Sequence, residues 1–115
     1  MALEQIAEAE SCLAEAEGAL PKEYAADVAY WQGRLLAARG RHIEAALALM
    51  RVPILHADRD REQTADALHR AGQSLEAAGV PQEEFVAVYK EAARSYVGTA
   101  WAERARRELA RLGSG

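Results

Sequence analysis

Several residue types that separate protein classes are rare or missing in this chain of 115 residues. It has one cysteine, Cys12, which excludes an internal disulfide and any zinc site built from several cysteines. It has no asparagine, and its only lysines are Lys22 and Lys90. No apolar run approaches the roughly 18 residues of a membrane-spanning helix, so we expect no membrane span.

The distribution of charge disfavours two further classes. The formal net charge is −4, whereas a general nucleic-acid binder is usually basic. The opening residues, MALEQIAEAE, lack the basic start and apolar run of a signal peptide. We expect no nucleic-acid partner, and a cytoplasmic location, or a periplasmic one if the sequence is an excised domain.

Alanine is the residue that the chain has in abundance, at roughly a quarter of all positions against a far lower average usage. Alanine is the best helix former, while the chain has only three prolines and few β-branched residues. The composition therefore predicts an all-α fold, and the length predicts one domain over residues 1–115.

Apolar residues at helical spacing divide the chain into about six helices joined by short turns. The first is amphipathic with an acidic outer face, and its apolar positions are Leu3, Ile6, Leu13, Ala16 and Leu20. The segment PILHADRD between the third and fourth helices is expected to be a linker. The helices are expected over about residues 3–20, 23–39, 43–52, 61–78, 81–96 and 100–112.

Turn and capping residues mark the ends of these helices. Asp60 is placed as an N-cap, with Gln63 as its capping-box partner three residues later. Pro81 suits the first turn of the fifth helix, and Thr99 is placed as the N-cap of the sixth. Three glycines are expected to close helices: Gly40, Gly79 and Gly113.

Two of the helices share a sequence pattern. GRLLAARG, which begins at Gly33, and GQSLEAAG, which begins at Gly72, both fit G-x-x-L-x-A-x-G, and they start 39 residues apart. A glycine inside a helix permits close approach of a neighbouring helix, and the leucine fills the interface. A fixed spacing of this length is typical of a helical repeat protein.

At these positions the chain resembles the tetratricopeptide repeat (TPR) family. The second unit carries the pattern of the family's first helix at Leu68, Ala71, Gly72, Leu75 and Gly79, and the first unit carries it at Ala29, Gln32, Gly33, Leu36 and Gly40. The second helices supply Ala45 and Leu49, then Phe85 and Tyr89, with one extra residue in the later turn. The spacing near 39, and the Gly-Thr-x-Trp-Ala start of a third unit, are similar to a variant found in bacterial envelope proteins, among them outer-membrane assembly lipoproteins and the coordinator associated with the Tol–Pal system.

The resemblance implies a short right-handed solenoid of antiparallel helix pairs. Its units would be an incomplete repeat over residues 1–21, repeats over 22–59 and 60–98, and a capping helix over 99–112. The concave groove of such a solenoid is lined by the first helix of each pair. Carried over residue by residue, the groove positions are Asp27, Tyr30, Arg34, Asp66, His69, Gln73, Glu76, Arg104, Arg107 and Arg111.

This groove would be acidic and polar in its middle and basic at one end. Because arginine pairs bidentately with carboxylates, an acidic peptide or a C-terminus is the ligand it would suit. The alternative is that the arginines solvate an exposed helix end and interact with its dipole. The eukaryotic co-chaperone form of the fold clamps a terminal carboxylate with Lys and Asn, which this chain does not place in the groove.

No residue pattern in the chain predicts an enzyme or a bound cofactor. His56, Asp58 and Asp60 could hold a metal ion, but Asp and His before a helix are ordinary capping and turn residues. Zinc-protease, phosphate-loop and paired-carboxylate motifs are absent. Among the aromatic residues, we expect Trp31 and Trp101 to wedge between helices and Tyr30 to be an exposed contact.

Two functions follow from the sequence as hypotheses. The first is a non-enzymatic module that binds a partner peptide or helix in its groove. The alternative is structural self-assembly, as a homodimer or an end-to-end oligomer, because an incomplete first repeat leaves Leu3, Ile6 and Leu13 short of partners.

Overall fold

The computed structural model describes residues 24–55 and 60–113, and in these two ranges the regular structure is helical throughout. This confirms the all-α class. Five of the helices have nine or more residues, against about six expected for the whole chain, and the expected helix over residues 3–20 lies outside the described residues. The helices are α2 (Ala25–Ala38), α3 (His42–Met50), α4 (Val52–Leu55), α5 (Arg61–Ala78), α6 (Gln82–Ser95) and α7 (Ala100–Arg111).

Local capping explains most of the helix ends. Asp60 accepts a hydrogen bond from the Gln63 backbone N–H at 3.0 Å, and Thr99 accepts one from the Ala102 N–H at 3.1 Å. Helices α2, α5 and α7 are each closed by a glycine in the left-handed region, with φ of +80° at Gly40, +78° at Gly79 and +75° at Gly113. These caps confirm the ends expected from the sequence.

Three local expectations were wrong. The first part of PILHADRD is not a linker, because α4 continues the helical path with a bond from the Leu55 N–H to the Arg51 carbonyl at 3.0 Å and Val52 is fully buried. Gln63 does not return its side chain to Asp60. Its side-chain Nε2 donates to the Asp27 carboxylate on α2 at 2.9 Å, which directs the side chain toward α2. Pro81 precedes α6 as its N-cap and does not lie in its first turn.

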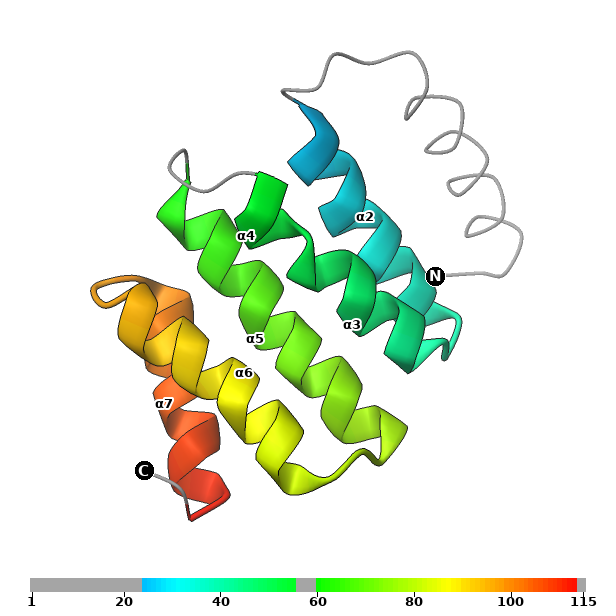
Figure 1. Ribbon diagram of the computed structural model, residues 1–115. Coiled ribbons are helices and arrows are strands. Elements are labelled where there is room, and N and C mark those ends of the chain that lie inside the picture. Colours follow the sequence, from blue (N-terminus) through cyan, green and yellow to red (C-terminus); the bar gives the residue numbers. More distant parts are fainter. Residues whose placement is uncertain (1–23, 56–59, 114–115) are drawn as a thin grey trace.

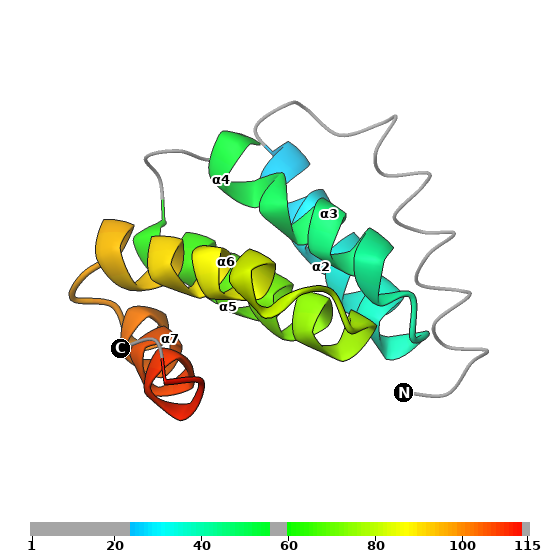
Figure 2. The ribbon, with the colours of Figure 1, turned by 60° about the horizontal axis from the view of Figure 1, so that its bottom comes forward.

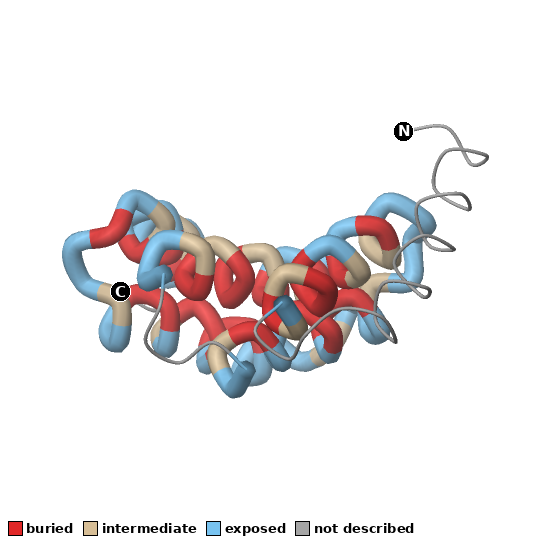
Figure 3. The backbone as a smooth tube through the Cα atoms, turned by 90° about the horizontal axis from the view of Figure 1, so that it is seen from above, coloured by how far each residue is buried: buried red, intermediate tan, exposed pale blue. Residues whose placement is uncertain are grey.

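The helices pack mainly on their neighbours in the chain (Figures 1 and 2). Helix α3 lies between α2 and α5, α6 lies against α5, and α7 contacts both α5 and α6. Seen along a third direction, the helices follow a shallow arc with buried residues along its middle and exposed turns at its ends (Figure 3). Helix α5 is therefore the central element, with the pair α2–α3 on one side and α6–α7 on the other.

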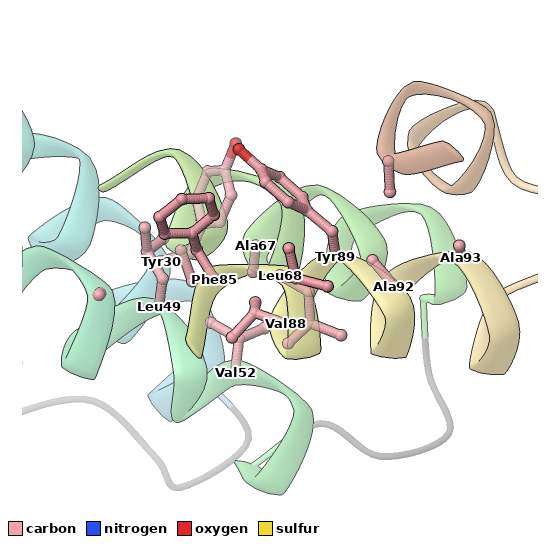
Figure 4. Packing of buried hydrophobic residues seen from close by; sticks show 14 of the residues in the cluster. Tyr30, Leu49, Val52, Ala67, Leu68, Phe85, Val88, Tyr89, Ala92 and Ala93 are labelled. Atoms are coloured by element: carbon pink, nitrogen blue, oxygen red, sulfur yellow. The ribbon is translucent and has the colours of Figure 1, made fainter. Parts of the chain in front are cut away.

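The core is thin and built largely from small residues. Many alanines are fully buried, among them Ala45, Ala67, Ala71 and Ala92. The larger side chains that fill the gaps include Tyr30, Leu49, Val52, Leu68 and Tyr89 (Figure 4). Alanine has no side-chain rotamers to lose on folding, so its abundance allows helices to pack closely at small entropic cost.

Two helical glycines set the distance between neighbouring helices, Gly33 in the pair α2–α3 and Gly72 in the pair α5–α6. A Cβ atom placed on Gly33 would lie 2.5 Å from Cγ of Leu49, and one on Gly72 would lie 2.6 Å from Cε1 of Tyr89. Neither position has room for a methyl group. The glycines are 39 residues apart, but their partners are 40 apart, because two residues separate Gly79 from the start of α6 and one residue separates Gly40 from the start of α3. Counted from the closing glycine, the later turn has the extra residue expected from the sequence.

We expect Gly72→Ala to destabilise the protein, although the same change in an open helix is stabilising. The added methyl group meets the ring of Tyr89, which is 0% exposed and has no free direction in which to move. Overpacking of this kind costs about 1–3 kcal/mol, against a gain of about 1 kcal/mol in helix propensity. Urea unfolding should therefore show a net loss of up to about 2 kcal/mol.

Gln73→Ala is the matched control, because the neighbouring Gln73 is exposed and its loss should change stability by less than about 0.5 kcal/mol. A Gly72→Ala variant that is more stable than wild type would contradict the close approach of α5 and α6.

Candidate functional site

A hollow of about 320 Å³ lies between α2, α3 and α5. Its apolar lining is Leu49, which is 1% exposed, with Ala37 and Ala77. Hydrogen-bond donors surround this apolar lining. They come from three helices and are Arg34, His42, Arg70, Gln73 and Ser74. A hollow that combines an apolar lining with several convergent donors is the usual form of a binding site.

The two arginines of the hollow differ in what they already bind. Arg70 forms an ion pair with Asp66 at 2.6 Å, and the same carboxylate accepts the Tyr30 hydroxyl at 2.7 Å. Arg34 lies over the ring of Trp31, 5.0 Å from its centroid, and the described residues offer it no carboxylate. The hollow therefore carries a positive charge, at Arg34, that no ion pair within the described ranges balances.

Two side-chain hydrogen bonds join α2 to α5. The Tyr30 hydroxyl donates to Asp66, and the Gln63 amide donates to Asp27 at 2.9 Å. Burial raises the pKa of Tyr30, and the hydrogen bond to Asp66 raises it further. Tyr30 thus keeps its proton and remains a donor. Because Asp27 and Asp66 both accept bonds from within the chain, the acidic character expected for the middle of the groove is largely satisfied internally.

Helices α5 and α7 form the other end of the groove expected from the sequence. The ring of Trp101 has the Arg104 guanidinium 4.2 Å from its centroid and the Arg70 guanidinium 5.2 Å from it. Farther along, Arg111 donates to both oxygens of Glu76, at 2.7 and 2.9 Å, and also to Glu108. The hydrogen bonds to Glu76 and Glu108 raise the pKa of Arg111. Glu76 and Arg111, both expected in the groove, are therefore paired with each other.

The residues expected to contact a partner occupy five different settings. Arg34 and Gln73 line the hollow, and Arg107 is exposed without a partner in the described part of the chain. Arg104 covers Trp101, and His69 is 5% exposed beneath the surface. The remaining residues bind other side chains of the protein: Asp27, Tyr30, Asp66, Glu76 and Arg111.

The expectation for two neighbouring aromatic residues was wrong in both cases. Tyr30 is 6% exposed, and Trp31, expected to wedge between helices, is 49% exposed. The buried face of α2 runs through Ala26, Ala29 and Gly33, and Tyr30 follows this spacing while Trp31 lies beside it. Burial of Tyr30 is stabilised because its hydroxyl reaches Asp66 on α5.

Three of the five donors that line the hollow were missed from the sequence: His42, Arg70 and Ser74. A signal existed for Arg70, since it lies four residues after Asp66 and such helical pairs interact. No signal existed for His42 and Ser74, whose places depend on how α3 approaches α5.

The described residues contain no group of three or more His, Cys, Asp or Glu side chains able to hold a metal ion. The suggested metal position includes His56 and Asp58, which lie outside the described residues. Of the helices between residues 24 and 113 that the structure describes, none combines the length and apolar character needed to cross a membrane.

Comparisons of the chain with protein-family models, with curated proteins and with solved structures found no match. The resemblance to the TPR family accordingly stays a prediction from the residues quoted above.

His69 is a buried titratable group at the junction of α5, α6 and α7. Its ring lies 5.6 Å from that of Tyr89 and 5.3 Å from that of Trp101, measured between centroids. Its Nδ1 atom is buried without a hydrogen-bond partner among the described residues. Burial lowers the pKa of His69, and nearby Arg104 and Arg70 act in the same direction, while Glu108 and Asp66 oppose them.

We expect this histidine to make the protein less stable in mild acid. Because the folded protein holds His69 below its ordinary pKa of about 6.5, the unfolded chain binds more protons as the pH falls through that value. The free energy of unfolding should fall between about pH 7 and pH 5. His69→Gln should flatten this fall, as measured by urea unfolding at each pH.

Gln73→Ala serves as the control, since it changes an exposed residue of the same helix, keeps every titratable group and should keep the wild-type pH dependence. An equal slope in wild type and His69→Gln would show that His69 is not the group responsible.

Proposed function

We propose that the helices belong to a short right-handed solenoid of the TPR type. Support comes from the repeated glycine contacts: Gly33 against Leu49 in the pair α2–α3, and Gly72 against Tyr89 in the pair α5–α6. The order of contacts is also that of a stacked array, since each pair contacts the next through α3 and α5. In this proposal α7 is the first helix of a third unit.

The proposed function is a non-enzymatic protein–protein interaction module that binds a partner peptide on the surface of α2, α5 and α7. The observation that carries this proposal is the hollow between α2, α3 and α5. It presents the guanidinium of Arg34, without a carboxylate partner among the described residues, next to the donors Arg70, Gln73 and Ser74. Such a set of donors suits a carboxylate. A carboxylate can accept several hydrogen bonds and can at the same time form an ion pair with a planar guanidinium.

The residues around the hollow favour an extended peptide as the ligand, and not a single small anion. Arg70, which lines the hollow, also lies 5.2 Å from the centroid of the Trp101 ring, and Trp101 is partly exposed and lies under Arg104. Arg107 on the same helix is exposed and unpaired in the described part of the chain. A peptide with one acidic group in the hollow and a second near α7 would meet arginine at both points.

The proposal is tested with a short fluorescent peptide of alternating Asp and Glu residues, titrated with the protein and followed by fluorescence anisotropy. Arg34→Gln should weaken binding about tenfold or more, since a hydrogen bond to a charged group contributes about 1.5–3 kcal/mol. Binding should also weaken as salt is added, because the pairing is electrostatic.

The matched control is Arg94→Gln, which removes an exposed arginine from α6, away from the hollow. It has the same change in net charge and should bind as wild type does. A peptide of alternating Asn and Gln residues should not bind. Equal loss in Arg34→Gln and Arg94→Gln, or binding of the neutral peptide, would reject the hollow as the binding site.

A further inference from the structure

The outer face of α3 carries apolar side chains that no described helix covers. Ile43 is 47% exposed, Leu47 is 62% exposed and Met50 is 38% exposed. Ile54 on α4, directly after α3, is 80% exposed. These four residues, here named the α3 stripe, account for half of the large hydrophobic side chains that are exposed in the described part of the chain. Single exposed apolar residues are common, but a row of them marks an interaction surface.

The spacing of the stripe places it on one side of the helix. Ile43, Leu47 and Met50 are separated by four and three residues, the interval of a helical face, and Ile54 continues the same interval. The buried residues of α3 project elsewhere, toward α2 and α5, and include Ala45 and Leu49. Apolar residues thus occupy well over half of the helix circumference, although α3 has packing partners for only part of it.

The stripe is flanked by two opposite charges. Glu44 and Arg51 are seven residues apart, so they lie on the same side of the helix, next to the stripe. Arg51 has no ion-pair partner among the described residues, and the one partner of Glu44 there is the exposed Arg41. A surface with an acid at one end and a base at the other is complementary to an antiparallel copy of itself.

We propose that the α3 stripe is the interface of a two-fold symmetric homodimer, in which α3 packs antiparallel to α3 of a second copy. A two-fold axis between Leu47 and Met50 sets Leu47 opposite Met50 of the second copy, and Ile43 opposite Ile54. The same axis sets Glu44 opposite position 53, so Arg51 of the second copy lies two residues, or about 3 Å, farther along the helix, within reach of the two long side chains. An isologous contact repeats each pair twice, which suits a stripe whose two halves match in this way.

This interface differs from the peptide surface and does not depend on it. His42 and Leu49 line the hollow, and each precedes a residue of the stripe by one position, or roughly 100° around the helix. The dimer also uses other residues than Leu3, Ile6 and Leu13, which lie outside the described residues. Failure of peptide binding and failure of dimerisation are therefore separate results.

The test is the mass of the full chain in solution, measured by sedimentation equilibrium from about 1 µM to about 1 mM, the range in which a small interface dissociates. Wild type should change from monomer to dimer within this range. Leu47→Glu should raise the dissociation constant at least tenfold. Val97→Glu is the matched control, because Val97 is 52% exposed outside the stripe and the same new charge there should leave the dissociation constant unchanged.

A charge exchange tests the orientation of the two copies. Glu44→Arg should weaken the dimer by setting arginine against Arg51 of the second copy. The double variant Glu44→Arg with Arg51→Glu should restore the wild-type dissociation constant, because the pairs are re-formed in reverse. Failure of the double variant to recover would reject the antiparallel arrangement.

Two other results would overturn the proposal. A wild-type mass that stays monomeric at every concentration rejects the second copy as the occupant of the stripe. If Leu47→Glu in addition lowers the melting temperature of that monomer, then the stripe is covered within the same chain. Equal weakening by Leu47→Glu and Val97→Glu would show that net charge, and not the stripe, controls association.

Discussion

The arrangement of the helices depends on two positions where a side chain is missing. At Gly33 and Gly72 the neighbouring helix comes so close that a Cβ atom would lie within 2.6 Å of Leu49 or Tyr89. In the pairs α2–α3 and α5–α6, the glycine on one helix therefore packs directly against a large side chain on the other. This contact fixes the distance between the two helices. Buried alanines continue the close contact along the helices, which explains how a core with few aromatic residues is filled.

The same contact positions the candidate site. Leu49 packs against Gly33 and also lines the hollow between α2, α3 and α5. Because α3 is held close to α2, α5 can approach α2 far enough for Tyr30 to reach Asp66. The Tyr30–Asp66 bond and the apolar lining of the hollow thus both follow from the spacing of one helix pair, and Arg34 is left facing the hollow without a carboxylate among the described residues.

Features set by short stretches of sequence were predictable, and those set by contacts between distant helices were not. The caps at Asp60, Thr99 and Gly79 involve residues within one turn of each other, so the sequence carries the whole signal. The place of Tyr30 was missed because a shift of one residue in helical phase exchanges a buried position for an exposed one. The pairing of Glu76 with Arg111 spans 35 residues and depends on the crossing of α5 and α7. For the hollow, the sequence therefore indicated Arg34 and Gln73 but missed His42, Arg70 and Ser74.

The most direct test of the close helix contact is the proton chemical shift of the α protons of Gly72. The position of a Cβ atom on Gly72 is 2.6 Å from Cε1 of Tyr89 and 2.9 Å from both ring carbons beside it, which places it over the ring face. One Gly72 α proton should therefore resonate upfield, and Tyr89→Leu should abolish the shift while the Gly33 resonances stay in place. A Gly72 α-proton shift that is ordinary, or unchanged in Tyr89→Leu, would contradict the contact on which this structure depends.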